Sequence, residues 1–400
     1  MAENQTALTP DQANWLEAYV ELRGDFTAAG SPENPVPAPG LYERAAKIGA
    51  SVIVFPDYTT ERDMSLVLDP ELAAAIMRRP EREEELIFRS DRKPLGSLPV
   101  FMDPKIAELA WTLGLSKYLL NMDGEDHREQ KDLLRAPLLK SMLSQDAPYV
   151  AKLCSEAAKE LSQQGGEFDV LPIVRKIPFN MVCRVLALDP ESEQAKELLD
   201  LVPDVTDFDG NPGALISTTQ KITEHTQRII KDRSLVPEGS VVMESILGAV
   251  DKGMVTEDQA SQLLVQIFLA GVESTEALLA NIFIEKISGE QQSSATVPRI
   301  GRIAAKDVTL RDAKGLEWSF KAGERVMVDL RGIYHVTQDD ELNFGRGAHA
   351  CPGKNLAKLI AHSFREALDN IDHSKFSIFE VKPGRSNLSD NYDEVLVLAV

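Results

Sequence analysis

The sequence predicts a mainly α-helical protein with small β-sheets, folded as a single large domain over residues 1–400. Three observations support this fold class. Hydrophobic residues make up 43% of the 400 residues, which is enough for a sizeable core. The pattern is mostly helical from about 103 to 290, and it is strand-like beyond residue 300. No internal repeat, low-complexity tract or clear linker divides the chain.

The N-terminal elements follow in order. Residues 1–39 form an extension that ends in a proline-rich connector, SPENPVPAPG. After it, LYERAAKIG predicts a helix and ASVIVFPDY, with its β-branched residues, predicts a short strand. DPELAAAIMRR predicts a second helix, because Asp-Pro suits a helix N-terminus.

Turn signals divide the long helical region, and strands follow it. The turn signals are MDGED, SQQGGEF, DGNPG and LVPEGS. Beyond residue 300, GRIAAKDVTL and EWSFKAGERVMVDL predict strands, as do SKFSIFEV and DEVLVLAV near the C-terminus.

Charge and cysteine content exclude several classes of partner. The net charge of −20 argues against nucleic-acid binding and against general attraction to anionic membranes. Cys154, Cys183 and Cys351 cannot all pair and show no CxxC spacing, which favours a reducing compartment. The N-terminus has neither a basic leader nor a long apolar run. We therefore expect a cytoplasmic protein without a signal peptide or membrane anchor.

One cysteine lies in a glycine-rich loop, FGRGAHACPGKNLA, at residues 344–357. The loop's glycines, at 345, 347 and 353, permit tight turns and leave backbone N–H groups that can point at the sulfur. A thiolate needs such donors to stay ionised as a metal ligand. His349 is a suitable partner for an anionic group. The alternative is a buried, inert cysteine.

The stretch QLLVQIFLAGVESTEALLANIF, at residues 262–283, is an apolar helix interrupted by AGVEST. Gly271 inside a helix costs about 1 kcal/mol relative to alanine, so a steric or functional reason is expected. Glu273 and Ser274 place an acid and a hydroxyl beside this glycine, and such a pair can pass protons through water. The alternative is an ordinary buried helix whose Ser and Thr side chains bond back to the preceding turn.

The cysteine loop resembles the haem-binding signature of the cytochrome P450 family, FGxGxHxCxGxxLA. The matched positions are Phe344, Gly345, Gly347, His349, Cys351, Gly353, Leu356 and Ala357. The resemblance implies a cytochrome P450-like fold, a haem b cofactor, and Cys351 as the axial thiolate that favours O–O cleavage.

The interrupted helix resembles the oxygen-activating helix of the same family, [AG]-G-x-[DE]-T. Ala270, Gly271 and Glu273 match, and Ser274 stands where the family has threonine. The hydroxyl is kept, and Thr275 is the neighbouring candidate. The resemblance implies that these residues lie beside the haem and handle protons.

Haem carries two carboxylates that need cationic partners when enclosed. MDGEDHREQKDLLR places His127 and Lys131 four residues apart, on one helix face. GRIAAKDVTL places Arg302 at the head of a strand. Both segments resemble family segments that hold these carboxylates, and with His349 they give four candidates.

The chain also departs from the family. None of the six glutamates between Ser274 and Cys351 has an arginine three residues on, so the family's Glu-x-x-Arg pair is missing. The interval is short as well, and EKISGEQQSSATVPRIGRI takes the place of two helices.

Together these features predict a monooxygenase that inserts oxygen from O2 into a small, largely apolar molecule. No strand-linked GxGxxG is present, so electrons would come from a separate ferredoxin or flavodoxin. Two alternatives stay open: a redox-neutral haem enzyme such as a dehydratase or isomerase, and a non-catalytic partner protein. Basic residues for an acidic donor are Arg128, Arg135, Lys140, Arg346, Lys354 and Lys358.

Overall fold

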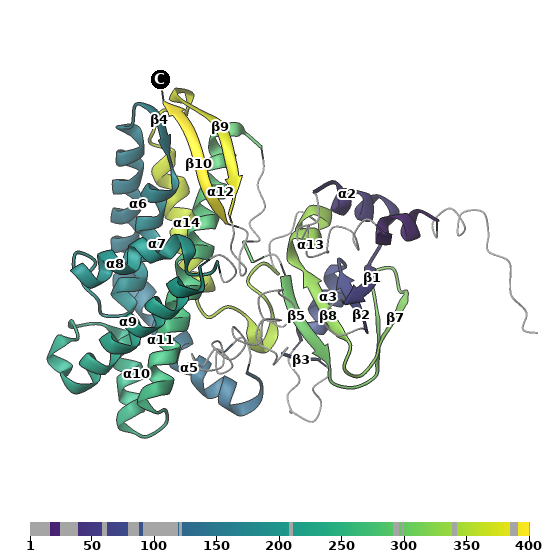
Figure 1. Cartoon of the computed structure of the whole chain (residues 1–400), viewed down its shortest axis with the longest axis horizontal. Helices are drawn as coiled ribbons and strands as arrows, with labels where there is room; N and C mark the ends of the chain where they lie inside the picture. Colours follow the sequence, from purple (N-terminus) through teal and green to yellow (C-terminus); the bar gives the residue numbers. More distant parts are fainter. Residues whose placement is uncertain are drawn as a thin grey trace, which may run out of the picture. The chain divides into compact units, whose positions relative to one another are not determined.

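A computed structural model describes most of the chain. The described residues are 17–24, 39–57, 62–78, 88–90, 119, 122–207, 211–290, 296–297, 299–337, 342–384 and 391–399. The chain divides into two compact units (Figure 1). Unit 1 comprises Met1–Asp91 and Arg299–Leu342, and unit 2 comprises Arg92–Pro298 and Asn343–Val400. Each is described by itself, and the assignment of residues 1–400 to one domain stays a prediction.

Unit 1 is built on a five-stranded sheet in the order β1-β2-β8-β5-β3. Strands β2 and β8 are parallel, and the other neighbours are antiparallel. A separate two-stranded sheet pairs β6 with β7. The strands are β1 Val52–Asp57, β2 Arg62–Val67, β3 Phe88–Ser90, β5 Arg299–Ala304, β6 Val308–Arg311, β7 Glu317–Phe320 and β8 Arg325–Asp329. All strands of unit 1 except β2 and β3 overlap segments that the sequence pattern predicted as strands, although β5 begins two residues before its segment and β6 ends one residue after it.

The helices of unit 1 are α2 Pro39–Ile48, α3 Pro70–Ile76 and α13 Leu330–Thr337. Helix α3 begins as predicted. Pro70 occupies the first turn, and the Asp69 carboxylate accepts hydrogen bonds from the backbone N–H groups of Glu71 and Leu72, at 3.0 and 2.9 Å. Helix α13 was not predicted, because its sequence, LRGIYHVT, follows a strand pattern without an obvious break.

Unit 2 contains most of the helices and the cysteine loop. A three-stranded antiparallel sheet, in the order β4-β10-β9, lies at its C-terminal end. The strands are β4 Gly166–Asp169, β9 Phe376–Pro383 and β10 Tyr392–Ala399. The helices are α5 Gly124–Ser141, α6 Ala147–Ser162, α7 Leu171–Val185, α8 Glu193–Leu201, α9 Pro212–Lys231, α10 Val241–Asp251, α11 Glu257–Gly271, α12 Glu273–Ser288 and α14 Lys354–Leu368.

Helix α11 contributes side chains to one hydrophobic cluster of unit 2, and helix α12 contributes to a second; Figure 1 shows the two helices within the unit. In the first, Phe268 of α11 meets Phe179 of α7 edge to face, with ring centroids 6.2 Å apart. In the second, Phe283 of α12 packs against Phe376 of β9 in the same way, also at 6.2 Å. Leu356 of α14 contacts both clusters. The core therefore holds the interrupted helix against the helix that follows the cysteine loop.

The α11–α12 stretch, Glu257–Ser288, is long and apolar enough to cross a membrane by length and composition. However, 72% of its apolar window is buried inside the protein. Its hydrophobicity is accounted for by the core that it forms.

Candidate functional site

The cysteine loop folds into a tight turn before α14. Gly345 and Gly347 have φ values of +65° and +69°, the left-handed conformation that glycine adopts without strain. The Cys351 N–H donates to the Phe344 carbonyl at 2.8 Å and so closes the loop. The Phe344 ring lies beneath two ammonium groups of α14, with Lys354 Nζ at 5.8 Å and Lys358 Nζ at 5.9 Å. These contacts hold the cysteine at the N-terminal end of α14.

The Cys351 sulfur lies among hydrogen-bond donors, as the glycine pattern predicted. Burial raises the pKa of this thiol overall, although hydrogen bonds from the backbone N–H groups of Gly353 and Lys354 and the charge of Lys131 oppose the rise. The residue is nevertheless solvent-accessible, whereas Cys154 and Cys183 are buried. Neighbouring atoms therefore desolvate the thiol group, although part of the residue stays accessible to solvent. Burial also raises the pKa of each of the other two thiols, to about 12, and both of those residues are buried.

Three of the four candidate partners for the haem carboxylates meet beside the loop. The rings of His127 and His349 lie with centroids 4.3 Å apart, and Lys131 donates to the Ala348 carbonyl. His127 is buried on α5, and Lys131 follows it one turn later, as the four-residue spacing predicted. The structure thus brings α5 and the cysteine loop together through these side chains.

Asp123 is a member of this group that the sequence interpretation missed. It occupies the N-cap position of α5 but makes no side-chain capping bond. Its carboxylate instead contacts Nε2 of His349, at 3.2 Å. The motif MDGED was read only as a turn signal, and nothing in the sequence pairs it with a residue 226 positions away. An anionic partner for His349 is therefore present within the protein itself.

Arg302, the fourth candidate, lies in unit 1 on β5. It is buried and its guanidinium donates to the Gly301 carbonyl at 2.7 Å. In the sheet, Arg302 is paired with Val326 of β8 and with Ser90 of β3. Its proposed role toward the haem stays a prediction.

The interrupted helix is broken at Val272, which separates α11 from α12. Ala270 is exposed and Ser274 is half-buried, although most of the surrounding helix is buried. These two residues are four apart and share one face. The helix therefore presents an open strip of small side chains at the break.

The space at Gly271 has a packing explanation. A Cβ atom added there would lie 3.0 Å from Cγ2 of Val182 on α7. Glycine at this position therefore lets α7 approach the break closely. Its predicted place beside a haem is not tested by this contact, but the steric reason for glycine is found on the α7 side.

The two hydroxyl groups at the break, on Ser274 and Thr275, differ in their exposure to solvent. Ser274 Oγ donates to the Ala270 carbonyl at 2.6 Å, which is the back-bonding that the alternative interpretation described. Thr275 is buried. The Ser274 hydroxyl still lies on the open face, so its oxygen can accept a hydrogen bond from that side.

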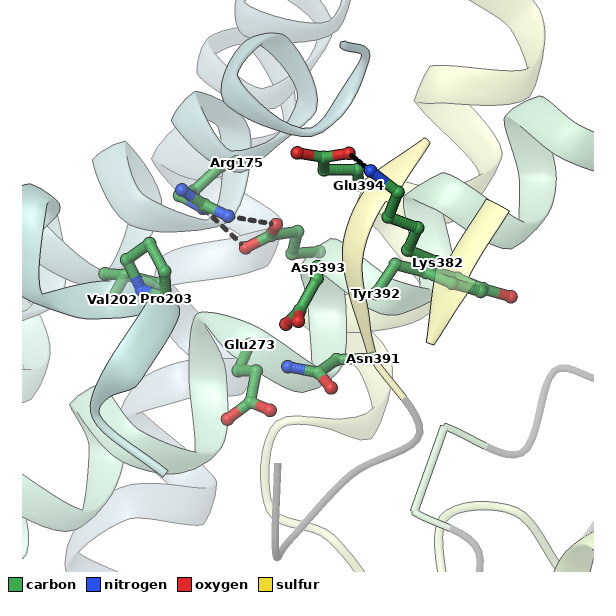
Figure 2. Close-up of a pocket in the computed structure, with 10 residues that line it drawn as sticks. Arg175, Val202, Pro203, Glu273, Lys382, Asn391, Tyr392, Asp393 and Glu394 are labelled. Carbon is green, nitrogen blue, oxygen red and sulfur yellow. Dashed lines mark hydrogen bonds and ion pairs between the residues drawn. The ribbon is translucent and has the colours of Figure 1, made fainter. Parts of the chain in front are cut away.

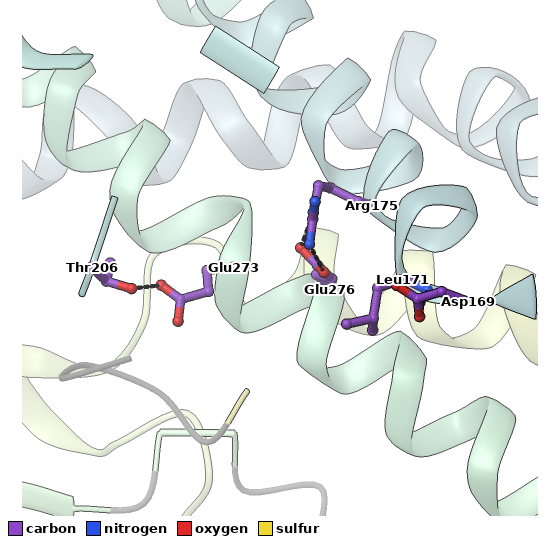
Figure 3. A network of polar contacts seen from close by, with 6 residues as sticks. All are labelled: Asp169, Leu171, Arg175, Thr206, Glu273 and Glu276. Carbon is purple, nitrogen blue, oxygen red and sulfur yellow. Dashed lines mark hydrogen bonds and ion pairs between the residues drawn. The ribbon is translucent and has the colours of Figure 1, made fainter. Parts of the chain in front are cut away.

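Glu273 precedes Ser274 in the sequence and makes a different set of contacts. It is buried and lines a pocket beside α12 (Figure 2). Its carboxylate accepts a hydrogen bond from the Thr206 hydroxyl (Figure 3). Thr206 lies in the segment between α8 and α9 and is itself buried. No sequence signal marked Thr206, because its pairing with Glu273 depends on the fold.

The segment in which the Glu-x-x-Arg pair was expected, between α12 and β5, is short. Only ten residues, 289–298, lie between the end of α12 and the start of β5, which is too few for two helices. The glutamates of α12 pair elsewhere. Glu276 binds Arg175 of α7 in two hydrogen bonds, at 2.8 and 2.9 Å, and Glu285 binds Arg365 of α14, at 3.2 and 3.3 Å. The second pair fastens α12 to the helix that follows the cysteine loop.

Comparison with known proteins gives one consistent result. No family model matches the chain. It is 21% identical over 277 residues to cytochrome P450(MEG) of Priestia megaterium, covering 60% of this chain and 67% of that protein. It is 17% identical over 284 residues to the polyketide biosynthesis cytochrome P450 PksS of Bacillus subtilis, covering 64% and 70% of the two chains.

Solved structures agree with these relatives. The chain is similar to CYP108D1 from Novosphingobium aromaticivorans, with a TM-score of 0.71 at 17% identity, covering 96% of this chain and 98% of that one. It is also similar to CYP164A2 of Mycobacterium smegmatis, with a TM-score of 0.66 at 17% identity and coverage of 96% and 100%. The chain therefore has the cytochrome P450 fold, and the mainly helical fold class with small sheets is confirmed.

Proposed function

We propose that the chain is a haem-thiolate monooxygenase of the cytochrome P450 type, acting on a small, largely apolar molecule. The observation that carries the proposal is the environment of Cys351. The residue is solvent-accessible, two backbone N–H groups donate to its sulfur, and the His127, Lys131 and His349 side chains lie beside the same loop. An inert core cysteine would be buried, as Cys154 and Cys183 are.

The donor set fits a haem b group. Cys351 would hold the iron, and the N–H groups of Gly353 and Lys354 would stabilise the negative charge on its sulfur. His127, Lys131 and His349 would hold the two carboxylates, and for Arg302 this role rests on the sequence resemblance alone. Residues that would flank the ring are Phe344, Gly345, Gly353, Ala270 and Gly271. Bound haem would supply the iron at which dioxygen is activated, and thiolate ligation favours O–O cleavage.

Side chains at the helix break would transfer protons. Ala270 is exposed and Ser274 is half-buried, so the Ser274 oxygen can accept a hydrogen bond from a water molecule on that face. Glu273 precedes Ser274, and its carboxylate accepts a hydrogen bond from Thr206 in a pocket beside α12. We assign Glu273 and Ser274 to proton transfer through water, with Thr275 as the neighbouring hydroxyl.

Electrons would come from a separate ferredoxin or flavodoxin. Arg128, Arg135 and Lys140 are exposed on α5, and Arg346 and Lys358 are exposed in and just after the cysteine loop. A basic surface on a chain of net charge −20 favours an acidic donor at that place. The similarity to PksS, named for polyketide biosynthesis, favours a role in secondary metabolism, and we propose a cytoplasmic location.

A second candidate is a redox-neutral haem enzyme or a non-catalytic partner protein with the same fold. The ten-residue connection after α12 favours it, because the Glu-x-x-Arg segment that the family places there is absent. The accessible, donor-rich Cys351 disfavours the non-catalytic version.

Oxygen isotope labelling separates these candidates. The haem-loaded protein is supplied with a ferredoxin, its reductase and an apolar test substrate under 18O2. A monooxygenase places one labelled atom in the product and needs the reductant. A product without 18O that forms in the absence of reductant would favour the redox-neutral enzyme. A purified protein that binds much less than one haem per chain would favour the partner protein.

A further inference from the structure

Gln266 is a polar side chain in the apolar part of helix α11. It is only 8% exposed, and the three residues before it, Leu263, Leu264 and Val265, all belong to a hydrophobic cluster of unit 2. A buried amide needs hydrogen-bond partners, because it has given up those that water supplied. The partners of Gln266 therefore decide what this side chain does.

The side-chain oxygen of Gln266 has a partner within the protein. Oε1 accepts a hydrogen bond from the Leu119 backbone N–H, at 2.6 Å. A backbone N–H only donates, and so does an amide nitrogen, so the atom that faces Leu119 is the oxygen. This contact fixes the orientation of the amide. The nitrogen, Nε2, is therefore directed away from the Leu119 N–H and keeps two hydrogens to donate.

These two hydrogens have no acceptor in the part of the chain that the structure describes. The one hydrogen bond of the Gln266 side chain there is the bond that its oxygen accepts. Buried donors in proteins are almost always paired, so a donor left over at such a position needs a specific explanation. A ligand that brings its own acceptor supplies one.

Gln266 shares one face of the helix with the residues at the break. Ala270 follows it by four residues and Ser274 by eight, which is the spacing of one helix face. The hydrogen bond from Ser274 Oγ to the Ala270 carbonyl shows that this spacing continues across the break. Ala270 is exposed and Ser274 is half-buried, so the face becomes more open towards the break. Gln266 lies at the buried end of the face that carries Ser274.

We propose that Gln266 is a specificity-determining residue, whose Nε2 donates a hydrogen bond to a carbonyl oxygen of the substrate. The inference rests on the proposed function, because it assigns one polar group to the largely apolar substrate. A carbonyl oxygen only accepts, which matches the donor that remains once the Leu119 N–H has taken the amide oxygen. An ammonium group only donates, so it does not match. The substrate class is therefore an apolar ketone or ester.

The amide discriminates against a plain hydrocarbon for the same reason. A hydrocarbon in this place would leave the Nε2 hydrogens buried without a partner, whereas a carbonyl pairs one of them. A site built to hydrogen-bond one group of a substrate rejects the analogue that lacks it. Removing the donor should therefore weaken binding of a ketone and leave binding of the matching hydrocarbon almost unchanged.

The test compares two matched probes on the haem-loaded protein: 1-tetralone, which carries a carbonyl, and tetralin, the same bicycle without it. Equilibrium dialysis gives both dissociation constants for the wild type and for Gln266→Met, which keeps the side-chain length but has no N–H donor. We expect the substitution to weaken 1-tetralone binding about fivefold relative to tetralin. The control Gln163→Met replaces an exposed glutamine at the end of α6 and should leave this ratio unchanged.

Infrared spectroscopy tests the hydrogen bond without relying on a variant. The carbonyl stretch of 13C-labelled 1-tetralone bound to the wild type should lie at a lower wavenumber than in hexane. In Gln266→Met the band should move back towards its position in hexane. No binding of 1-tetralone, an unshifted band in the wild type, or an unchanged ratio of the two dissociation constants in Gln266→Met would overturn the inference.

The proposed function is tested separately, by the thiolate–haem spectrum of the same preparation. A wild type without that spectrum that still binds 1-tetralone through Gln266 would remove the haem-thiolate assignment alone. A wild type that shows the spectrum, but whose ratio does not change in Gln266→Met, would remove the present inference alone.

Discussion

Replacing Arg175 with methionine removes one partner of a buried ion pair. The Nε and Nη2 atoms of Arg175 donate to the two carboxylate oxygens of Glu276, at 2.8 and 2.9 Å (Figure 3). The two side chains are only 14% and 7% exposed. Methionine keeps the length of the side chain but removes its charge, so the Glu276 carboxylate stays buried without its cation.

The chain supplies a matched comparison for the size of this effect. Arg365 and Glu285 form the same two-bond contact, but these side chains are 42% and 32% exposed. Breaking a buried pair by removing one partner costs roughly 3–5 kcal/mol of unfolding free energy. An exposed pair is worth about 0.2–1 kcal/mol. Arg175→Met should therefore cost several times more than Arg365→Met.

The effect of Arg175→Met should also depend on pH. Burial raises the pKa of Glu276 above its ordinary value even beside Arg175, so the folded protein keeps this proton to a higher pH than the unfolded chain does. Stability from this group is therefore present at low pH and is lost as the pH rises through the window between the two pKa values. Without Arg175, whose hydrogen bond and charge lower the pKa, the window extends upward. The loss should be larger at about pH 8 than at about pH 5.

Urea denaturation followed by circular dichroism measures these free energies at both pH values. The double variant Arg175→Met/Glu276→Gln should recover much of the loss, because it leaves no buried charge. If Arg175→Met cost no more than Arg365→Met, or cost the same at both pH values, the assignment of a buried, charge-dependent pair would be wrong.

Three further results are expected. Gly271→Ala should destabilise the protein by about 1–2 kcal/mol, because its Cβ would lie 3.0 Å from Val182 Cγ2, and a paired Val182→Ala change should remove most of that cost in thermal unfolding. Iodoacetamide should label only Cys351 in native haem-free protein, since the other two thiols are buried; labelling of either of them before unfolding would refute this. Lys131→Met should increase the rate of haem transfer to apomyoglobin about tenfold, because one partner of the haem carboxylates is lost. Lys140, exposed on the same helix, supplies the control Lys140→Met, which should leave the rate unchanged. Equal rates in the two variants would contradict the role of Lys131.

Local patterns predicted the local structure well. The Asp-Pro pair placed the start of α3, and the glycines at 345 and 347 take the left-handed conformation that the loop needs. The four-residue spacing of His127 and Lys131 put both on the loop side of α5. In each case the local structure depends on residues a few positions apart in the sequence, so the sequence alone can predict it.

Contacts across long sequence separations were not predictable in the same way. Asp123 was read as part of a turn, but it binds His349. A steric or functional reason was expected for Gly271, but no sequence signal identified Val182 of α7 as the neighbouring side chain. Thr206, which holds Glu273, carried no signal. These partners are set by how α5, α7 and the segment before α9 pack, which a single sequence does not reveal without an alignment of relatives.

The ferrous carbon-monoxide difference spectrum of protein supplied with haem tests the central claim most directly. If the Cys351 thiolate ligates the iron, the wild type and a Cys183→Ala control should show the red-shifted band of thiolate-ligated haem, and Cys351→Ala should lose it. A wild-type spectrum without that band, or one that survives in Cys351→Ala, would contradict the account.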